Sequence, residues 1–261
     1  TTIYYTPYMG NKISLYNTTT GLWTVHEFAQ ISHGLGSETA DTNYDVFAKS
    51  TNGVVSLATP VAWSANTTRD VELVLQDGVY CKTGALDERY IGTYRTTDQT
   101  GECEDSFSKR LVWNAYNRVE RHMYHIPSAA GWTGGGATIR QAAATAANQI
   151  ECVAGLDGTG ITVYNSAMCT NGTAAVDSYM QVGIGQSSTT ANATGTVIVA
   201  AVAAVADAMY ASTAYLSKHK PEGYHFYTML ESNTAVGTMT WYGNNGVPGV
   251  RQGGIAAMVW M

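Results

Sequence analysis

Short runs in which apolar and polar residues alternate make up much of the chain, and turn-forming residues separate them. In residues 12–16, for example, Ile13 and Leu15 fall on one face of a strand and Ser14 falls on the other. Such alternation predicts half-buried β-strands, because successive side chains of a strand point to opposite faces. We find no long segment with the spacing of an amphipathic helix. The pattern therefore predicts an all-β protein.

Turn signals recur at short spacing between the strand candidates. Residues 50–53 contain Asn-Gly and residues 76–78 contain Asp-Gly, the pairs that favour tight hairpins. Residues 157–160 predict a hairpin turn between strands at 150–154 and 161–165. Many short strands joined in this way are typical of sandwiches and jelly rolls. We predict an antiparallel β-sandwich of jelly-roll type with a smaller N-terminal β-meander region.

The N-terminal part of the chain predicts the meander and a domain boundary. Its strand candidates are residues 3–8, 11–16 and 22–28. The short polar stretch from Gly84 to Glu88 is the most plausible junction. We therefore predict an N-terminal β-rich attachment or shaft region at residues 1–88 and a C-terminal β-sandwich assembly domain at residues 89–261.

Two segments do not follow the strand pattern. The alanine-rich residues 140–148 predict two turns of helix, which would need tertiary packing because so short a helix is marginal alone. Residues 194–210 combine valines at helical spacing with β-branched residues, which indicates a strand running into an irregular or helical piece. Within them, residues 197–206 are the most apolar run, and they are too short to cross a bilayer. We expect no membrane partner.

Much of the scarce charge lies between Arg89 and Arg121. Two β-rich runs, residues 90–97 and 109–119, bracket a polar connection and predict a wide antiparallel pair. Three basic and three acidic residues of this stretch form either a structural ion-pair network or a catalytic or metal cluster: Arg110, Arg118, Arg121, Glu102, Glu104 and Asp105. Their spacing matches neither an acid/base pair nor a metal loop, so we interpret the cluster as structural.

Several blocks of the sequence resemble a known family. They are Tyr90-Ile-Gly-Thr-Tyr-Arg-Thr-Thr97, Glu102-Cys-Glu-Asp-Ser106, Lys109-Arg-Leu-Val-Trp-Asn-Ala-Tyr-Asn-Arg-Val119, Ile3-Tyr-Tyr-Thr-Pro-Tyr-Met-Gly-Asn11, Gly223-Tyr-His225 and Trp241-Tyr-Gly243. The blocks are similar to those of structural proteins of tailed bacteriophages, and the resemblance spans nearly the whole chain. One departure is Cys103, which stands where a polar residue is expected.

The resemblance implies a non-enzymatic virion protein, a capsid decoration or a head or tail fibre component. It implies a homotrimer that contacts other virion proteins, such as the major capsid or tail proteins, and that is assembled in the host cytoplasm. Host surface glycans are a further expected contact. The apolar ending Met258-Val-Trp-Met261 is compatible with a trimer, because a last strand of this kind needs cover and another subunit would provide it.

The composition agrees with a protein that assembles or binds sugars. Charged residues make up 13% of the chain, about half the usual share, while there are 27 Gly and 17 Tyr residues. The surface must therefore consist mainly of Thr, Ser, Asn, Gly and Tyr. The formal net charge of −6 argues against a nucleic-acid partner.

The six histidines suggest no site, and we predict no catalytic, cofactor-binding or metal residue. His122 and His125 are three apart in a strand and would point to opposite faces. His219 and His225 flank a turn and could approach each other, but no third ligand is near in sequence. The remaining two histidines, His26 and His33, lie in the predicted N-terminal meander without acidic neighbours.

The alternative class is a carbohydrate-binding or glycan-depolymerising β-protein. Exposed tyrosines and tryptophans can stack on sugar rings, although a buried Trp beside Thr is more often part of the core. The tryptophan candidates are Trp23, Trp63, Trp132 and Trp241. A depolymerase would also need two carboxylates about 5 to 10 Å apart in a groove. The only dense acidic cluster, Glu102 to Asp105, lies among arginines.

The four cysteines allow two interpretations. They lack Cys-x-x-Cys spacing and are Cys81, Cys103, Cys152 and Cys169. An even number would allow disulfides in a secreted chain, with three possible connectivities. A phage protein folds in a reducing cytoplasm, so we favour free and mostly buried thiols.

Overall fold

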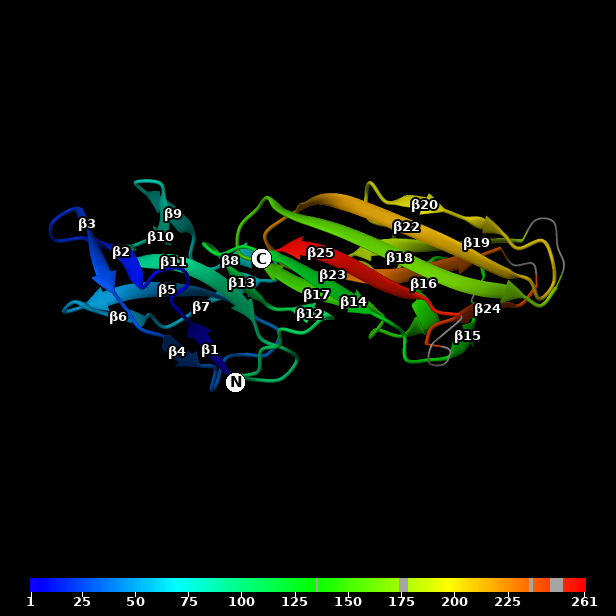
Figure 1. The fold of residues 1–261 in the computed structure, drawn as a ribbon, viewed down its shortest axis with the longest axis horizontal. Coiled ribbons are helices and arrows are strands. Elements are labelled where there is room, and N and C mark those ends of the chain that lie inside the picture. The colour runs from blue at the N-terminus through cyan, green and yellow to red at the C-terminus, as the bar shows by residue number, and fades with distance from the viewer. Residues whose placement is uncertain (135, 174–177, 235–236, 245–250) are drawn as a thin grey trace.

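Strands joined by turns and short loops make up the computed structural model (Figure 1). The structure describes residues 1–134, 136–173, 178–234, 237–244 and 251–261. Within these ranges the only helical element is the three-residue 3₁₀ helix Ala142–Ala144. No helix in the described part of the chain has the length and apolar character needed to cross a membrane. The predicted all-β fold is confirmed.

Two antiparallel sheets of the C-terminal part form a jelly roll. Each sheet has four main strands. When these eight strands are counted in chain order, the first sheet has the order 1-8-3-6 and the second has the order 2-7-4-5, which is the two-sheet order of a jelly roll. The first sheet contains β14 (Glu120–His125), β25 (Gly254–Trp260), β18 (Thr159–Asn171) and β22 (Met209–Lys220). The second contains β17 (Gln149–Ala154), β23 (Gly223–Asn233), β19 (Tyr179–Gln186) and β21 (Ala201–Val202).

Short strands extend these two sheets. β20 (Val197–Val199) pairs with β22 at the edge of the first sheet. In the same sheet, β24 (Met239–Tyr242) pairs with β18 and with β15 (Gly131–Thr133). In the second sheet, β12 (Lys109–Arg110) pairs with β17, and β16 (Arg140–Gln141) pairs with β23. The β12 pairing is parallel, and all the other registered pairings are antiparallel.

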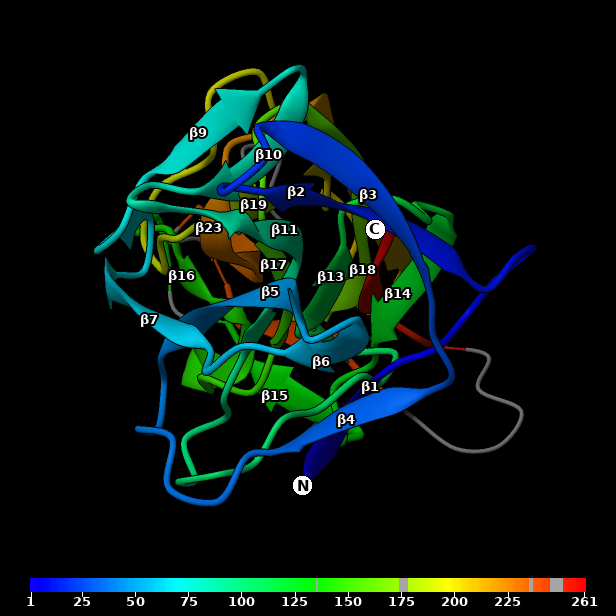
Figure 2. The ribbon, with the colours of Figure 1, turned by 90° about the vertical axis from the view of Figure 1, so that its left-hand side faces the viewer.

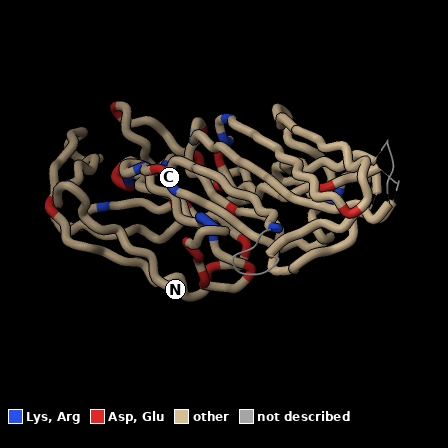
Figure 3. Tube along the Cα trace, turned by 45° about the vertical axis from the view of Figure 1, so that its right-hand side comes forward, with Lys and Arg blue, Asp and Glu red and all other residues tan. Residues whose placement is uncertain are grey.

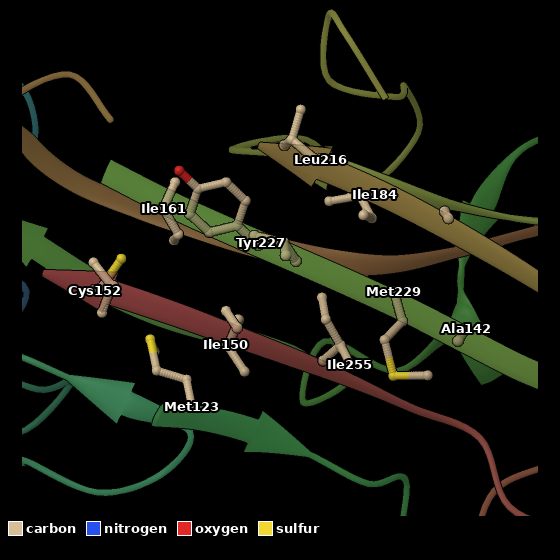
Figure 4. Packing of buried hydrophobic residues seen from close by; sticks show 14 of the residues in the cluster. Met123, Ala142, Ile150, Cys152, Ile161, Ile184, Leu216, Tyr227, Met229 and Ile255 are labelled. Atoms are coloured by element: carbon tan, nitrogen blue, oxygen red, sulfur yellow. The ribbon is translucent and has the colours of Figure 1, made fainter. Parts of the chain in front are cut away.

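Alternation along the strands builds the core between the two sheets. In β22, Ala214 and Leu216 are buried while Tyr215 between them is exposed. In β25, Ile255, Ala257 and Val259 are buried in the same way. Figure 4 shows side chains of both sheets, among them Leu216 and Tyr227, filling the space between the strands. Each large aliphatic side chain buried there stabilises the fold by about 1.5–3 kcal/mol.

An eight-stranded sheet dominates the N-terminal part, with the long strands β5 (Asn43–Thr51) and β11 (Ala85–Arg95) at its centre. Its other strands are β6 (Val54–Leu57), β7 (Val61–Ala65), β8 (Thr68–Arg69), β9 (Leu73–Gln76), β10 (Val79–Lys82) and β13 (Val112–Asn114). Residue 88 lies inside β11, and the predicted boundary there stays a prediction.

Two strand pairs flank this sheet, as seen along the molecule from its N-terminal end in Figure 2. They are β2 (Lys12–Asn17) with β3 (Leu22–Glu27), and β1 (Thr2–Tyr5) with β4 (Ile31–Gly34). The N-terminal region is β-rich as predicted, although β1 pairs with β4 rather than with the next strand along the chain. Ile13 and Leu15 of β2 are buried in a second, smaller core, which confirms their common face.

The Asn-Gly and Asp-Gly turns are confirmed. Asn52 and Gly53 have φ of 51° and 84°, and Asp77 and Gly78 have φ of 51° and 82°. Two consecutive positive φ angles are the requirement of a type I′ hairpin turn, and Asn or Asp followed by Gly meets it with the least strain. These local signals therefore place β5 against β6 and β9 against β10.

The helix predicted at residues 140–148 is wrong. Arg140 and Gln141 form a short strand, and Ala143 and Ala144 have φ of 55° and 50°, outside the right-handed helical region. The Asn148 side chain donates a hydrogen bond of 2.8 Å to the backbone oxygen of Ala142. Tertiary contacts therefore decided the conformation of a segment too short to be stable as a helix.

The hairpin predicted at residues 157–160 is also wrong. The strands on either side exist, but β17 belongs to one sheet of the jelly roll and β18 to the other. The turn carries the chain across the core instead of pairing the two strands. In residues 194–210 the strand interpretation is correct, because β20 and β21 form there and β22 begins at Met209.

The last strand is covered within its own chain. β25 pairs with β14 on one edge and with β18 on the other. Met261 is buried, and its backbone exchanges hydrogen bonds with Val119. The expectation that another subunit must cover this strand is therefore wrong for its edges, and only its outward side chains remain exposed.

Two buried arginines hold the N-terminal sheet against the jelly roll, in the middle of the molecule where Figure 3 shows many of the charged residues. Arg69 donates hydrogen bonds to Asp45 (2.7 Å), to Glu222 (2.6 Å) and to the backbone oxygen of Gly155. Arg95 binds Asn43 and Asn66 and lies 3.8 Å from the centre of the Tyr224 ring. The junction is therefore a network of buried charges and amides.

Replacing Asp45 with Ala should destabilise the protein strongly, because Arg69 would lose its buried carboxylate partner and keep only the partly exposed Glu222. We expect the free energy of unfolding to fall by about 3–5 kcal/mol. Chemical denaturation followed by tryptophan fluorescence measures it. Asp41→Asn is the control, since Asp41 pairs with Arg95 from an exposed position and Asn tolerates the positive φ of 54° at this residue. It should lower the stability by less than about 1 kcal/mol. Equal losses in the two variants would contradict this account of the junction.

Candidate functional site

The charged stretch between residues 89 and 121 forms the antiparallel pair that its sequence predicts. β11 pairs with β13, with Gly92 opposite Asn114 and Tyr94 opposite Val112. In the connection between them, the guanidinium of Arg110 lies 3.0 Å from the carboxylate of Asp105. The ion-pair interpretation is confirmed for this pair.

The other charges of the stretch have varied surroundings. The ammonium of Lys109 lies 3.6 Å from the carboxylate of Glu104. Arg118 lies over the ring of Trp113 at 5.2 Å, a cation–π contact. Arg121 is exposed in β14 opposite Val259. The six candidate charges thus do not gather at one point.

Histidines occupy separate environments. His122 is exposed on the outer face of β14, whereas His125 contacts the Asn148 side chain at 3.1 Å, so the prediction of opposite faces is confirmed. The prediction that His33 lacks an acidic neighbour is wrong, because its Nε2 lies 2.7 Å from the Glu38 carboxylate. A turn between the two residues brings them together, and the short separation in sequence was the available signal.

His225 and Lys220 are buried together near the junction, whereas His219 is exposed in β22. The His225 ring contacts the Ser187 hydroxyl at 3.1 Å, and the Lys220 ammonium donates to the Gly223 oxygen at 2.8 Å. Burial, together with the nearby Lys220 charge, lowers the pKa of His225 to about 4. Burial likewise lowers the pKa of Lys220 to about 8. In the described ranges, no group of three His, Cys, Asp or Glu side chains is arranged to hold a metal.

The cysteines are free, as favoured from the sequence. Three of them are buried, namely Cys81, Cys152 and Cys169, and Cys103 is partly buried. Burial raises the pKa of all four thiols. A thiol with a raised pKa carries little of the reactive thiolate form.

The tryptophans are less exposed than a sugar-stacking surface requires. Trp63 and Trp241 are buried, which agrees with the core alternative and excludes both as sugar-stacking residues. The indole nitrogens of Trp23 and Trp132 donate to Asp77 and Glu231. Sequence reasoning missed Trp260, which is 51% exposed because it follows the buried Val259 in the outward register of β25.

Three hollows of the described surface each have one carboxylate in their lining. Asp87 lines one hollow, Glu120 lines the hollow beside Trp260, and Glu231 lines a third. A retaining or inverting glycosidase mechanism needs two carboxyl groups facing one substrate. These hollows therefore offer the depolymerase alternative no candidate pair.

The outer face of the first jelly-roll sheet combines polar residues with a central aromatic row, and we call it the tyrosine face. This row runs across four strands through Tyr124, Ala256, Tyr164 and Tyr215. The rings of Tyr164 and Tyr215 lie 5.0 Å apart, and both side chains are exposed. Exposed aromatic side chains that lie side by side in this way are a candidate interaction surface.

The valine edge adjoins this face. It consists of Val197, Val199, Val202 and Val205, which lie on β20, on β21 and in the segment after them. Val197 and Val199 are 60% and 61% exposed. Residues 178–206 contain no Asp, Glu, Lys or Arg. Natural edge strands usually carry charge to prevent association, and this edge has none, so it is a second candidate interaction surface.

No protein-family model matches the chain, and no curated protein sequence matches it significantly. The jelly roll itself occurs in viral capsid and lectin domains, among others. A fold shared by several functions does not select one of them. The tyrosine face, the valine edge and the hollows are therefore the features of this structure that bear on its function.

The buried His225 predicts a loss of stability in acid. Because its pKa is about 4 in the folded protein and 6.5 when unfolded, the unfolded chain binds the extra proton between these values. Stability is therefore fully present above pH 6.5 and falls as the pH is lowered towards 4. At pH 4 these two pKa values correspond to a loss of about 3 kcal/mol from this group.

Denaturant unfolding of the wild type and of His225→Gln at several pH values measures this contribution. The variant keeps a group that can hydrogen-bond to Ser187 but does not titrate in this range. Its stability should depend less steeply on pH. Parallel curves for the two proteins would exclude His225 as a source of the acid sensitivity.

Proposed function

We propose that the chain is a non-enzymatic structural protein of a tailed-bacteriophage virion, a capsid decoration or fibre component. It assembles as a homotrimer, binds other virion proteins such as the major capsid or tail proteins, and is located in the virion after assembly in the host cytoplasm. The observation that carries the proposal is the tyrosine face beside the uncharged valine edge on a jelly roll. The sequence blocks that resemble phage structural proteins support the same conclusion.

The tyrosine face and the valine edge favour a ring of subunits. A two-fold dimer needs one patch that complements itself, whereas a cyclic ring brings two different patches of the chain together. Here the valine edge of one protomer would pack on the tyrosine face of the next. The contact is heterologous, and a rotation of one third of a turn closes it as a trimer.

The same surfaces supply the energy of assembly. Obligate interfaces bury more than about 2,000 Å² in total and are rich in apolar side chains. Aromatic residues bury the largest areas, and Tyr124, Tyr164 and Tyr215 lie in one row of the tyrosine face. Because charge is nearly absent from the valine edge, we expect the trimer to depend little on salt.

Contact with host surface glycans is the second part of the proposal, and it also covers the carbohydrate-binding alternative. A hollow in the N-terminal part combines exposed tyrosines with an arginine that has no described acidic partner. It lies on other strands than the tyrosine face, so both functions fit on one protomer.

Light scattering of the purified protein at micromolar concentration should give three times the 27.9 kDa mass of one chain. The double variant Val197→Lys with Val199→Lys should shift the protein to monomers, because lysines on an edge strand prevent its association. Both side chains point into solvent, so the thermal unfolding of the monomer should change little.

The matched control is the double variant Val25→Lys with Val54→Lys. These valines are 60% and 69% exposed on strands of the N-terminal part. The control should remain trimeric. A wild-type protein that is monomeric under these conditions would count against the proposed assembly.

A further inference from the structure

A hollow of about 460 Å³ opens on the N-terminal part of the molecule. Two blocks of sequence that resemble phage structural proteins, residues 3–11 and 109–119, meet in its wall although about 100 residues separate them. The lining of this hollow includes Tyr5, Tyr8, Phe28, Arg89, Asn114 and Tyr116. We call this hollow the arginine groove.

Aromatic rings form the walls of the arginine groove. Tyr5 and Phe28 stack with their ring centres 5.0 Å apart and their planes within 5° of parallel. Tyr8 is 66% exposed, and Tyr116 is exposed on another wall. An aromatic ring with one face open to solvent offers a surface on which the apolar face of a sugar can pack. The groove thus offers stacking surfaces and, between them, space for a small ligand.

Arg89 supplies a cation that the protein does not neutralise. Its Nε donates to the Tyr116 hydroxyl at 3.1 Å and its Nη1 donates to the backbone oxygen of Ser14 at 2.9 Å. Four arginines, at positions 69, 95, 110 and 140, have carboxylate partners. Among the described residues Arg89 has none, and neither do the arginines at positions 118, 121 and 251, but of these four Arg89 is the one that lines a described hollow. The other groove cation, Lys12, lies 3.7 Å from Glu27.

The guanidinium is held in place before any ligand arrives. It lies 4.4 Å from the centre of the Tyr116 ring. The turn that carries Tyr116 is fixed by Asn114, whose side-chain oxygen accepts hydrogen bonds from the backbone nitrogens of Tyr116 and Asn117 at 2.9 and 3.0 Å. Binding therefore needs little reordering of the arginine, which favours affinity.

We propose that the arginine groove binds a carboxylate-bearing saccharide, a uronic or sialic acid unit of a surface glycan. The guanidinium takes the carboxylate through its unoccupied N–H groups, and the sugar ring packs on Tyr8 and Tyr116. The Nε and Nη1 groups of Arg89 already donate hydrogen bonds within the protein, so one edge of the guanidinium remains free. A planar carboxylate can accept two parallel hydrogen bonds from that edge, which favours it over a phosphate ester. The inference rests on the proposed contact with host glycans and names its chemical class.

The hollow beside Trp260 was the other candidate for a sugar. Glu120 is the only carboxylate among its lining residues, and Met258 and Trp260 place it on the face proposed for assembly. A trimer would cover that face. The arginine groove has no such conflict, because its walls come from the N-terminal strands and the turn after β13.

Calorimetric titration with trigalacturonate and with a sialic acid dimer tests the proposal, with the methyl esters of both as neutral counterparts. We expect at least one acid to bind and its methyl ester to bind about tenfold more weakly or not at all, which is the effect of one charged hydrogen-bonding partner. Arg89→Gln should cause a similar loss of affinity for the acid. Arg89→Lys should restore only part of it, because lysine keeps the charge but not the fork.

Tyr8→Ala provides a second variant that does not touch the anchored arginine. It should weaken binding several-fold through the lost stacking surface while leaving the melting temperature unchanged, since Tyr8 is exposed. Arg251→Gln is the matched control. Arg251 also donates a hydrogen bond to a tyrosine hydroxyl, that of Tyr242. It lies next to the isolated bridge between Asn244 and Gln252 and is not among the residues that line the groove. It should bind the acid like the wild type.

Equal binding of acids and methyl esters, no binding of either acid, or unchanged binding by both Arg89 variants would overturn the inference. Competition by inorganic phosphate at equal concentration would also overturn it, because it would show a general anion site. Light scattering of the same samples reports assembly separately. A trimer that ignores acidic sugars refutes the groove alone, and a monomer that binds them refutes the assembly alone.

Discussion

Burial of one face of each jelly-roll strand is the constraint on which the rest of the structure depends. Because side chains alternate, filling the core with residues such as Leu216 and Val259 forces Tyr215 and Trp260 outward. A chain with few charged residues then covers its outer faces with tyrosine, valine, threonine and serine. The same alternation that stabilises a protomer therefore produces the surfaces that we propose for assembly.

Charge is concentrated where apolar packing does not suffice. Arg69 and Arg95 bind groups from both parts of the molecule at the junction, where burial makes each pairing directional. Such networks specify one relative placement of two packed units, because removal of a single partner leaves an unpaired buried group. The outer jelly-roll face needs no such direction. Arg89 departs from this arrangement, since it is anchored by a hydroxyl and a backbone oxygen and faces an open groove.

The surfaces proposed for assembly and for recognition lie in different parts of the chain. The tyrosine face and the valine edge belong to the jelly roll, whereas the arginine groove is built from the N-terminal strands and the turn after β13. A ring of jelly rolls would present several copies of the groove together. Repeated weak contacts of one ligand type then act with a raised effective concentration, which suits the binding of a glycan-coated surface.

The sequence by itself determined the local elements. Alternation predicted the common face of Ile13 and Leu15, and Asn52-Gly53 predicted a tight turn, because both depend on neighbouring residues alone. Beyond the hairpins that these turns define, only the tertiary structure decided which strands lie side by side. It placed β17 and β18 in opposite sheets, and it brought Arg89 to Tyr116 and Ser14. Periodicity shows which residues share a face but not what covers it, since strand pairing and burial depend on contacts between residues far apart in the chain.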